Sequence, residues 1–194
     1  MKEYFNCFVG VPLNLEFKYE FEQIQKKLQS LMPNASVVEP HNAHLTLHFL
    51  GTQNLKNLEE IAHILYEEKD VIGGEELKIG DRGIFYRKNH FENVPYIVYL
   101  KVTHTTRLFD FKKHLSSHLD SYNKEDERSF VPHVTLARLK TTESESQYKE
   151  HSADIDDLLS EIKLRFRLKE IFIYGKPNPD SSGFPEVLFK VSLI

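Results

Sequence analysis

Two short motifs of the same form lie far apart in this chain, and they constrain its fold more than any other feature. HLTL occupies residues 44–47 and HVTL occupies residues 133–136. The two histidines are 133 minus 44, or 89, residues apart. Each motif alternates polar and apolar residues, which is typical of a half-buried strand, because successive side chains of a strand point to opposite faces. The sequence therefore predicts two similar strands, each with an imidazole and a hydroxyl on one face.

The segments around the two motifs follow the same order. Alternating apolar residues predict strands, and apolar residues at steps of three and four predict amphipathic helices. The first half predicts a strand at 4–11, a helix at 13–32, the motif strand at 43–50, a helix at 55–65 and a strand at 77–86. The second half predicts a strand at 95–102, a helix at 107–122, the motif strand at 131–139, a helix at 155–162 and strands at 164–174 and 186–193.

This repeated order predicts an α+β fold of two duplicated βαβα-type halves. We expect one domain over 1–194 made of two lobes, at about 1–93 and 94–194. Polar or turn-rich segments at 88–93, 141–152 and 175–185 are expected to be loops. Such loops commonly set access to a site, so the substrate is the property they affect most.

Composition excludes several other classes of protein. The chain has 40% hydrophobic residues and no apolar run of about 20 residues, so we expect a water-soluble protein without a membrane span. A formal charge of -4 argues against duplex DNA or another polyelectrolyte as partner. Cys7 is the single cysteine, which excludes an intramolecular disulfide and a cysteine zinc cluster and favours a reducing cytoplasm. We read the first residues as a strand rather than as a signal peptide.

The residue types in the motifs suit chemistry at a phosphodiester. Histidine and threonine two positions apart on a strand lie about 7 Å from each other on one face. With an ordinary pKa of about 6.5, one histidine can carry a proton near neutral pH while its counterpart lacks one, as acid and base catalysis requires. Threonine hydroxyls can donate hydrogen bonds to the phosphate oxygens on which charge accumulates. This arrangement needs no metal ion.

HLTLHFLG at 44–51 and PHVTLAR at 132–138 resemble the paired signatures of the two-histidine phosphoesterase superfamily. More closely, the chain resembles the RNA 2′,3′-cyclic phosphodiesterases of the 2′-5′ RNA ligase family. The resemblance implies a bilobal fold with a pseudo-twofold axis, antiparallel sheets facing a central cleft, and hydrolysis of a 2′,3′-cyclic phosphate to a 2′-phosphomonoester without cofactor or metal. It implies that His44 is the general acid, that His133 is the general base, and that Thr46, Thr135 and Arg138 bind the substrate.

The expected partners are RNA ends or small cyclic nucleotides, bound by a monomer. Two nearby residues are harder to place. Strand alternation puts Arg138 on the face opposite His133, so its assignment requires that the strand end or bulge there. Alternation also puts His48 on the face of His44, where we expect it at the rim or in solvent.

Three alternatives remain open. His41, His44 and His48 have the spacing of zinc ligands if their segment is helical, although Pro40 favours an extended segment. A protein of this fold can instead act on 2′-5′ oligoadenylates or other cyclic nucleotides, or bind nucleotides without turnover. Basic residues form either a local RNA-facing patch or, more simply, a solvated strand face; they are Arg82, Arg87, Lys88, Lys163, Arg165, Arg167 and Lys169.

Overall fold

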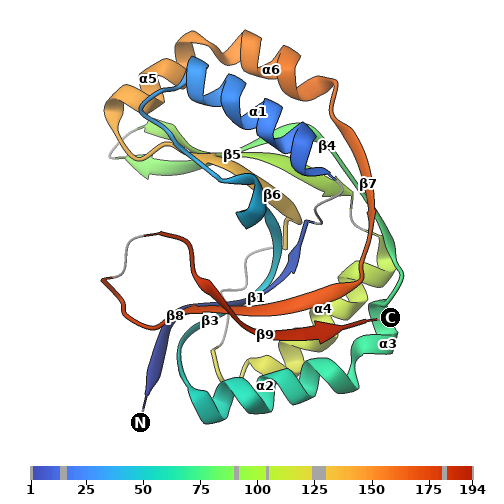
Figure 1. Ribbon diagram of the computed structural model, residues 1–194. Coiled ribbons are helices and arrows are strands. Elements are labelled where there is room, and N and C mark those ends of the chain that lie inside the picture. Colours follow the sequence, from blue (N-terminus) through green and yellow to red (C-terminus); the bar gives the residue numbers. More distant parts are fainter. Residues whose placement is uncertain are drawn as a thin grey trace.

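One continuous antiparallel sheet forms the centre of the protein. The structure is a computed structural model, and it describes residues 2–13, 17–89, 92–103, 105–123, 130–180 and 183–193. The strand order is β7-β4-β5-β6-β3-β1-β8-β9, with β2 paired to β6 off this path (Figure 1). The strands are β1 (Glu3–Pro12), β2 (Ser36–Val37), β3 (His44–Asn54), β4 (Glu76–Asn89), β5 (Glu92–Thr103), β6 (His133–Arg138), β7 (Lys163–Arg167), β8 (Glu170–Lys176) and β9 (Glu186–Ser192).

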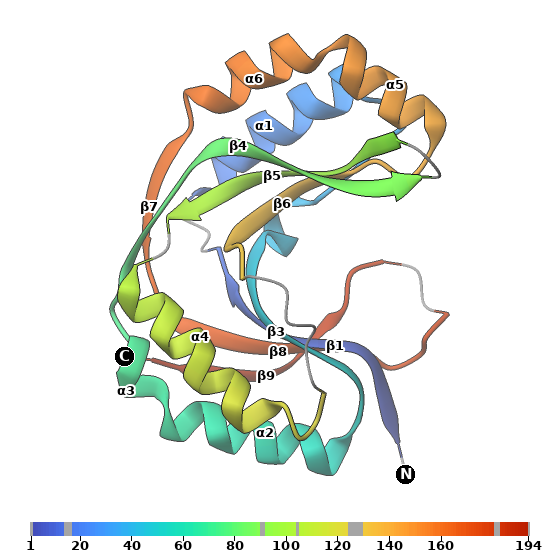
Figure 2. The ribbon, with the colours of Figure 1, turned by 180° about the vertical axis from the view of Figure 1, so that it is seen from behind.

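Helices cover the outer side of the curled sheet at both of its ends (Figures 1 and 2). They are α1 (Lys18–Leu31), α2 (Leu55–Glu67), α3 (Lys69–Ile72), α4 (Thr106–Leu119), α5 (Thr142–Glu150) and α6 (Ser152–Ser160). The short 3-10 helix η2 (Pro40–Asn42) lies apart from them, just before β3. Among the described helices, none is both long enough and apolar enough to cross a bilayer. The expected α+β class with antiparallel strands is confirmed.

The two lobes do not coincide with the two halves of the sequence. One lobe combines β4 to β7 with α1, α5 and α6, and the other combines β1, β3, β8 and β9 with α2, α3 and α4 (Figure 2). The expected division into lobes at 1–93 and 94–194 is therefore wrong. The physical reason is that α1 and α4 each pack against an element of the other half of the sequence: α1 packs on α6, and α4 packs on β3.

A pseudo-twofold axis passes between β3 and β6. The two strands pair at Leu45 and Val134, which are 134 minus 45, or 89, residues apart. The neighbouring pairs repeat this offset, because Gly10 lies opposite Thr46 and Tyr99 lies opposite Thr135, again 89 residues later at both positions. The spacing between the motifs is thus the spacing of two equivalent sets of strands.

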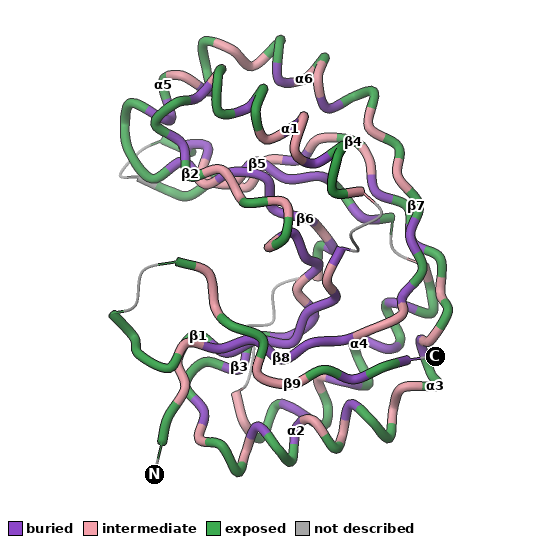
Figure 3. The backbone as a smooth tube through the Cα atoms, in the orientation of Figure 1, coloured by how far each residue is buried: buried purple, intermediate pink, exposed green. Residues whose placement is uncertain are grey.

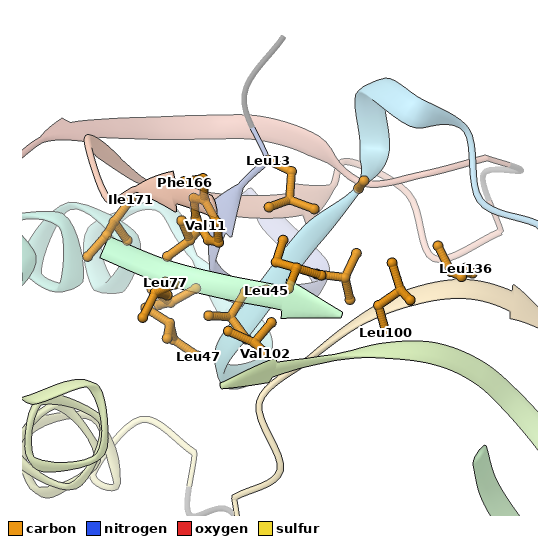
Figure 4. Close-up of a cluster of buried hydrophobic side chains, with 14 of the residues drawn as sticks. Val11, Leu13, Leu45, Leu47, Leu77, Leu100, Val102, Leu136, Phe166 and Ile171 are labelled. Atoms are coloured by element: carbon orange, nitrogen blue, oxygen red, sulfur yellow. The ribbon is translucent and has the colours of Figure 1, made fainter. Parts of the chain in front are cut away.

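Buried apolar side chains from the strands and helices of both lobes form one core. Figure 3 shows that the buried residues lie along the strands of both lobes and recur along the helices. Figure 4 shows the central part of this core, to which Leu45 of β3, Leu100 of β5 and Leu136 of β6 contribute. All three are less than 5% exposed. Burial of this continuous apolar surface on both sides of the axis holds the two motif strands at a fixed separation.

Most expected elements are present, but the loop predicted at 141–152 is wrong, because it contains α5. Thr141 caps this helix, because its hydroxyl accepts a hydrogen bond from the Ser144 amide at 3.2 Å. In return, the Thr141 amide donates a hydrogen bond to the Ser144 hydroxyl at 3.1 Å. Polar composition concealed the helix because its inward face consists of Ser144, Glu145 and Tyr148. Parts of the expected first helix and of the expected turns, at 14–16, 90–91 and 181–182, lie outside the described residues.

Candidate active site

A β-bulge follows the threonine of each motif. In β3, Thr46 lies opposite Gly10 and His48 lies opposite Val9, so Leu47 is the additional residue. In β6, Thr135 lies opposite Tyr99 and Ala137 lies opposite Val98, so Leu136 is the additional residue. Each bulge reverses the alternation of side chains beyond it. Residues three positions after each threonine therefore return to the face that carries the motif histidine.

This bulge accounts for the position of Arg138. Its guanidinium is partly buried, and its positive charge acts on both His44 and His133. The bulge that its assignment requires is thus present, and the disagreement between motif and alternation disappears. The equivalent residue of the other motif is Phe49, because 138 minus 49 is 89, and Phe49 is 58% exposed. The two sides of the site therefore differ: one presents a cation and the other an aromatic ring.

His48 is turned the other way by its bulge. It is 0% exposed, which contradicts the expected position at the rim or in solvent. Its Nε2 is 3.1 Å from the Asn123 carbonyl oxygen, and its Nδ1 is 3.4 Å from both Lys112 Nζ and Ser116 Oγ of α4. His48 therefore links the motif strand to the helix behind it and does not face His44.

The two motif histidines are held in the same way. His44 Nδ1 is 2.7 Å from the Asn42 carbonyl oxygen, and His133 Nδ1 is 2.7 Å from the Val131 carbonyl oxygen. A carbonyl oxygen only accepts hydrogen bonds, so in both rings Nδ1 carries the proton and donates it. Nε2 of each neutral imidazole is then the basic nitrogen that is available for proton transfer.

Burial and neighbouring charge lower the pKa of both histidines. Burial is the largest cause at His44, where the charges of Arg138 and His133 add to it against the hydrogen bond to Asn42, and the pKa falls to about 4. At His133, burial and then Arg138 lower the pKa, again against a hydrogen bond. Burial also lowers the pKa of Arg138. The positive charge of Arg138 disfavours the protonated form of both imidazoles, and a bound anion would favour that form, because its negative charge offsets the repulsion.

The threonines lie on the same faces as their histidines, Thr46 partly buried and Thr135 8% exposed. The structure therefore brings His44, His133 and Arg138 into electrostatic contact and places the threonine of each motif two residues along the same strand. This arrangement provides two proton-transfer groups and several hydrogen-bond donors around a position where an anion can bind.

Aromatic rings surround both histidines, and motif reasoning did not identify them. His44 contacts Phe8, Tyr174 and Phe184, with ring centroids 4.9, 5.8 and 5.2 Å away. His133 contacts Phe85 and Tyr99 at 4.9 and 5.1 Å. The alternation of β1 does place Phe8 opposite the core residues, but the other rings come from distant strands and from the segment after Gly183, so the sequence order carries no signal for them.

A pocket of about 480 Å³ adjoins His44. Two of its lining rings, those of Tyr174 and Phe184, contact His44. The full lining is Pro12, His41, Asn42, Phe172, Tyr174, Phe184, Pro185, Glu186 and Val187. Its walls suit a flat, partly apolar group bound beside a charged one, because aromatic faces pack against other π-systems.

The structure separates the three histidines with zinc-like spacing. His41 is exposed in η2, His44 shares a face of β3 with Thr46, and His48 is buried against α4. His44 and His48 lie in the strand β3 rather than on one face of an α-helix, and His41 precedes them in a single 3-10 turn, so these residues do not converge on one ion.

Three of the seven basic residues that could form an RNA-facing patch pair with acidic side chains of the protein. Arg82 pairs with Asp156, Arg87 Nη2 lies 2.7 Å from Glu145 Oε1, and Arg165 Nη1 lies 3.4 Å from Glu76 Oε1. In β7, exposed basic residues flank the buried Phe166. The interpretation as a solvated strand face is the better account of this segment.

Comparison with known proteins identifies relatives of the same architecture. The family model described as the AKAP7 2'5' RNA ligase-like domain matches residues 5–170. An RNA 2′,3′-cyclic phosphodiesterase of Thermotoga maritima is 32% identical over 133 residues, which is 69% of each chain. A protein of the same name from Methanothermobacter thermautotrophicus is 25% identical over 168 residues, 82% of this chain and 88% of that one.

Solved structures show the same fold. Thermus thermophilus TT0787 superposes with a TM-score of 0.71 at 19% identity over 97% of both chains. E. coli LigT in complex with 3'-AMP gives a TM-score of 0.71 at 17% identity over 97% of this chain and 98% of LigT. The match of the family model over most of the chain, together with this shared fold, shows that the protein belongs to the 2′-5′ RNA ligase-like family of two-histidine phosphoesterases.

Proposed function

We propose that this protein hydrolyses RNA or nucleoside 2′,3′-cyclic phosphates to 2′-phosphomonoesters without a metal ion. The observation that carries the proposal is the pair of symmetry-related imidazoles, each with Nδ1 fixed by a main-chain carbonyl and both beside Arg138. The name shared by the relatives from Thermotoga maritima and Methanothermobacter thermautotrophicus supports this activity. The 3'-AMP complex of LigT supports a nucleotide as the ligand.

In the proposed reaction, His133 Nε2 removes a proton from a water molecule whose oxygen attacks phosphorus. The bond between phosphorus and the 3′ oxygen breaks as His44 donates a proton to that oxygen, which leaves the phosphate on the 2′ oxygen. Arg138, Thr46 and Thr135 hold the non-bridging oxygens, on which negative charge increases in the transition state. After the reaction His133 is protonated and His44 is neutral. The starting state returns when His133 releases its proton to solvent and His44 takes one up.

In this proposal the substrate itself helps to protonate His44. Near pH 7 in the free protein, burial and Arg138 keep His44 neutral, with a pKa of about 4. A bound phosphate brings a negative charge beside this imidazole and raises its pKa, which allows the complex to hold the proton that the reaction consumes. The charged side at Arg138 then faces the phosphate, and the aromatic pocket beside His44 receives the nucleoside.

The proposal is tested with purified protein in EDTA and a panel of nucleoside 2′,3′-cyclic phosphates, with ³¹P NMR to identify the product. We expect 2′-monophosphates as products, and a loss of turnover on the order of 10²-fold or more in both His44→Ala and His133→Ala. Full activity of the double variant would overturn the site assignment.

Extending the panel identifies the substrate class. It should include RNA that ends in a 2′,3′-cyclic phosphate and 2′-5′ oligoadenylates. A strong preference for the oligoadenylates would replace the proposed substrate with a 2′-5′ linkage. Tight binding of all these nucleotides with no product would instead indicate a binding protein.

A further inference from the structure

Three potential metal ligands converge on the helical surface of the lobe that contains His44. Glu68 lies at the junction of α2 and α3, and His114 and His118 lie four residues apart on α4. One ligand atom from each residue lies within 4.8 Å of the other two. Within the described part of the chain, no other three His, Cys, Asp or Glu side chains come together in this way.

We propose that Glu68, His114 and His118 bind a divalent transition-metal ion, with Zn²⁺ as the best match. Two histidines and one glutamate are a ligand set that zinc accepts, and histidines four residues apart on a helix present their rings on the same side. At zinc–ligand distances of about 2.0–2.2 Å, two ligands of a tetrahedral site lie about 3.3 Å apart. His114 Nε2 and Glu68 Oε1 are already 3.0 Å apart.

The second histidine is oriented for the same ion. The centroids of the His114 and His118 rings are 4.6 Å apart, and His118 Nδ1 is 3.0 Å from the His114 carbonyl oxygen. Because that oxygen only accepts, Nδ1 of His118 donates and its Nε2 keeps the lone pair for a metal. Zinc-binding histidines commonly donate their other ring nitrogen to a carbonyl in this way. An ion pair of Glu68 with His114 would not account for the position of His118.

The site would fasten α4 to the α2–α3 junction. At the start of α4, Arg107 Nε donates to the Val71 carbonyl oxygen at 2.6 Å, and the metal would add a second link about two turns later. The opposite side of α4 carries Lys112 and Ser116, which contact His48 of β3. A bound ion would therefore stabilise the helix that supports the catalytic strand, and it would take no part in the proposed reaction.

Calorimetric titration of the untagged full chain with Zn²⁺, and absorption spectra with Co²⁺, test the site. We expect one tightly bound ion per chain and at least about tenfold weaker binding in His114→Ala, His118→Ala and Glu68→Gln, because loss of a direct ligand costs at least as much as loss of an outer partner. The matched control is His63→Ala, since His63 pairs with Glu67 at 3.8 Å on α2, also with a spacing of four residues. It should bind the ion as tightly as the unchanged protein.

Two further measurements decide between this site and other histidines. The variant with both His44 and His133 changed to alanine should retain the tightly bound ion, and Zn²⁺ should raise the thermal midpoint of the unchanged protein but not that of the variant lacking both His114 and His118. Circular dichroism checks that each variant is folded. Unchanged binding in the variant without His114 and His118, or loss of binding in the variant without His44 and His133, would overturn the proposal.

Discussion

At the scale of single residues, the environment of the two imidazoles is the property that most affects function. Removal from water and a nearby positive charge both disfavour the protonated form of an imidazole. Burial and the charge of Arg138 lower the pKa of both motif histidines. Predictions at this scale therefore concern protons and how the protein responds to pH.

Replacement of His44 by glutamine should make the protein less sensitive to acid. Below pH 6.5 the unfolded chain protonates this imidazole, whereas the folded chain does so only near pH 4, so the free energy of unfolding falls as pH drops through this window. Between pH 7 and pH 5 this group should cost about 2 kcal/mol in the unchanged protein and nothing in His44→Gln. Urea unfolding at both pH values measures the difference, with His63→Gln as control. Equal losses in all three proteins would contradict the assigned shift.

Replacement of Arg138 by methionine should move the pH optimum upward. Its charge lowers the pKa of both histidines, so its removal raises both, and the bell-shaped profile of kcat/KM shifts to higher pH. The maximum should fall on the order of 10²-fold, because the phosphate loses a charged hydrogen-bond donor. Arg165→Met, at an exposed position of β7, is the matched control and should leave the profile unchanged. An unshifted optimum in Arg138→Met would place the guanidinium outside the site.

At the scale of elements, local irregularities of the strands decide which residues meet. The bulges at Leu47 and Leu136 direct Arg138 toward the histidines and His48 away from them. A glycine has a similar effect in β4, where Gly83 lies opposite Tyr99 of β5. A Cβ atom there would be 2.1 Å from the Tyr99 ring, so only glycine leaves room for that ring beside His133.

Gly83→Ala should therefore displace Tyr99 and disturb the site. We expect a loss of about 1–3 kcal/mol in stability from overpacking, together with lower turnover, because Tyr99 stacks on Phe85 and contacts His133. The double variant Gly83→Ala, Tyr99→Ala should lose less stability than the sum of its single variants, since removal of the ring removes the clash. Strictly additive losses in urea unfolding would show that the two side chains do not conflict.

At the scale of the whole molecule, the core across the pseudo-twofold axis couples the two lobes. Leu45 is 0% exposed and pairs with Val134 on that axis. Since the buried cluster runs through both lobes, the site between the motif strands depends on their common packing. The lobes should therefore unfold together rather than one after the other.

Leu45→Ala should destabilise the entire protein. Truncation of a buried leucine costs about 2–5 kcal/mol, and the loss should appear as a shift of a single urea transition followed by both circular dichroism and tyrosine fluorescence. Leu55→Ala is the matched control, because Leu55 is 41% exposed at the start of α2, and its effect should stay within about 0.5 kcal/mol. Two separate transitions for Leu45→Ala would indicate that the lobes unfold independently.

The sequence by itself determined the strand and helix types, the 89-residue repeat and the face shared by each histidine and its threonine. These properties depend on local periodicity, which a chain expresses wherever an apolar face must be buried. It could not determine that α5 replaces an expected loop, because there polar residues form the inward face.

Only the tertiary structure decided which elements share a lobe, where Arg138 and His48 point, and which rings surround the histidines. Each depends on a bulge, a crossing helix or a contact between distant strands. Such features arise from packing between segments that are far apart in the chain, and no local pattern records them. The motif residues are therefore visible in the sequence, whereas the environment that sets their pKa values exists only in the folded protein.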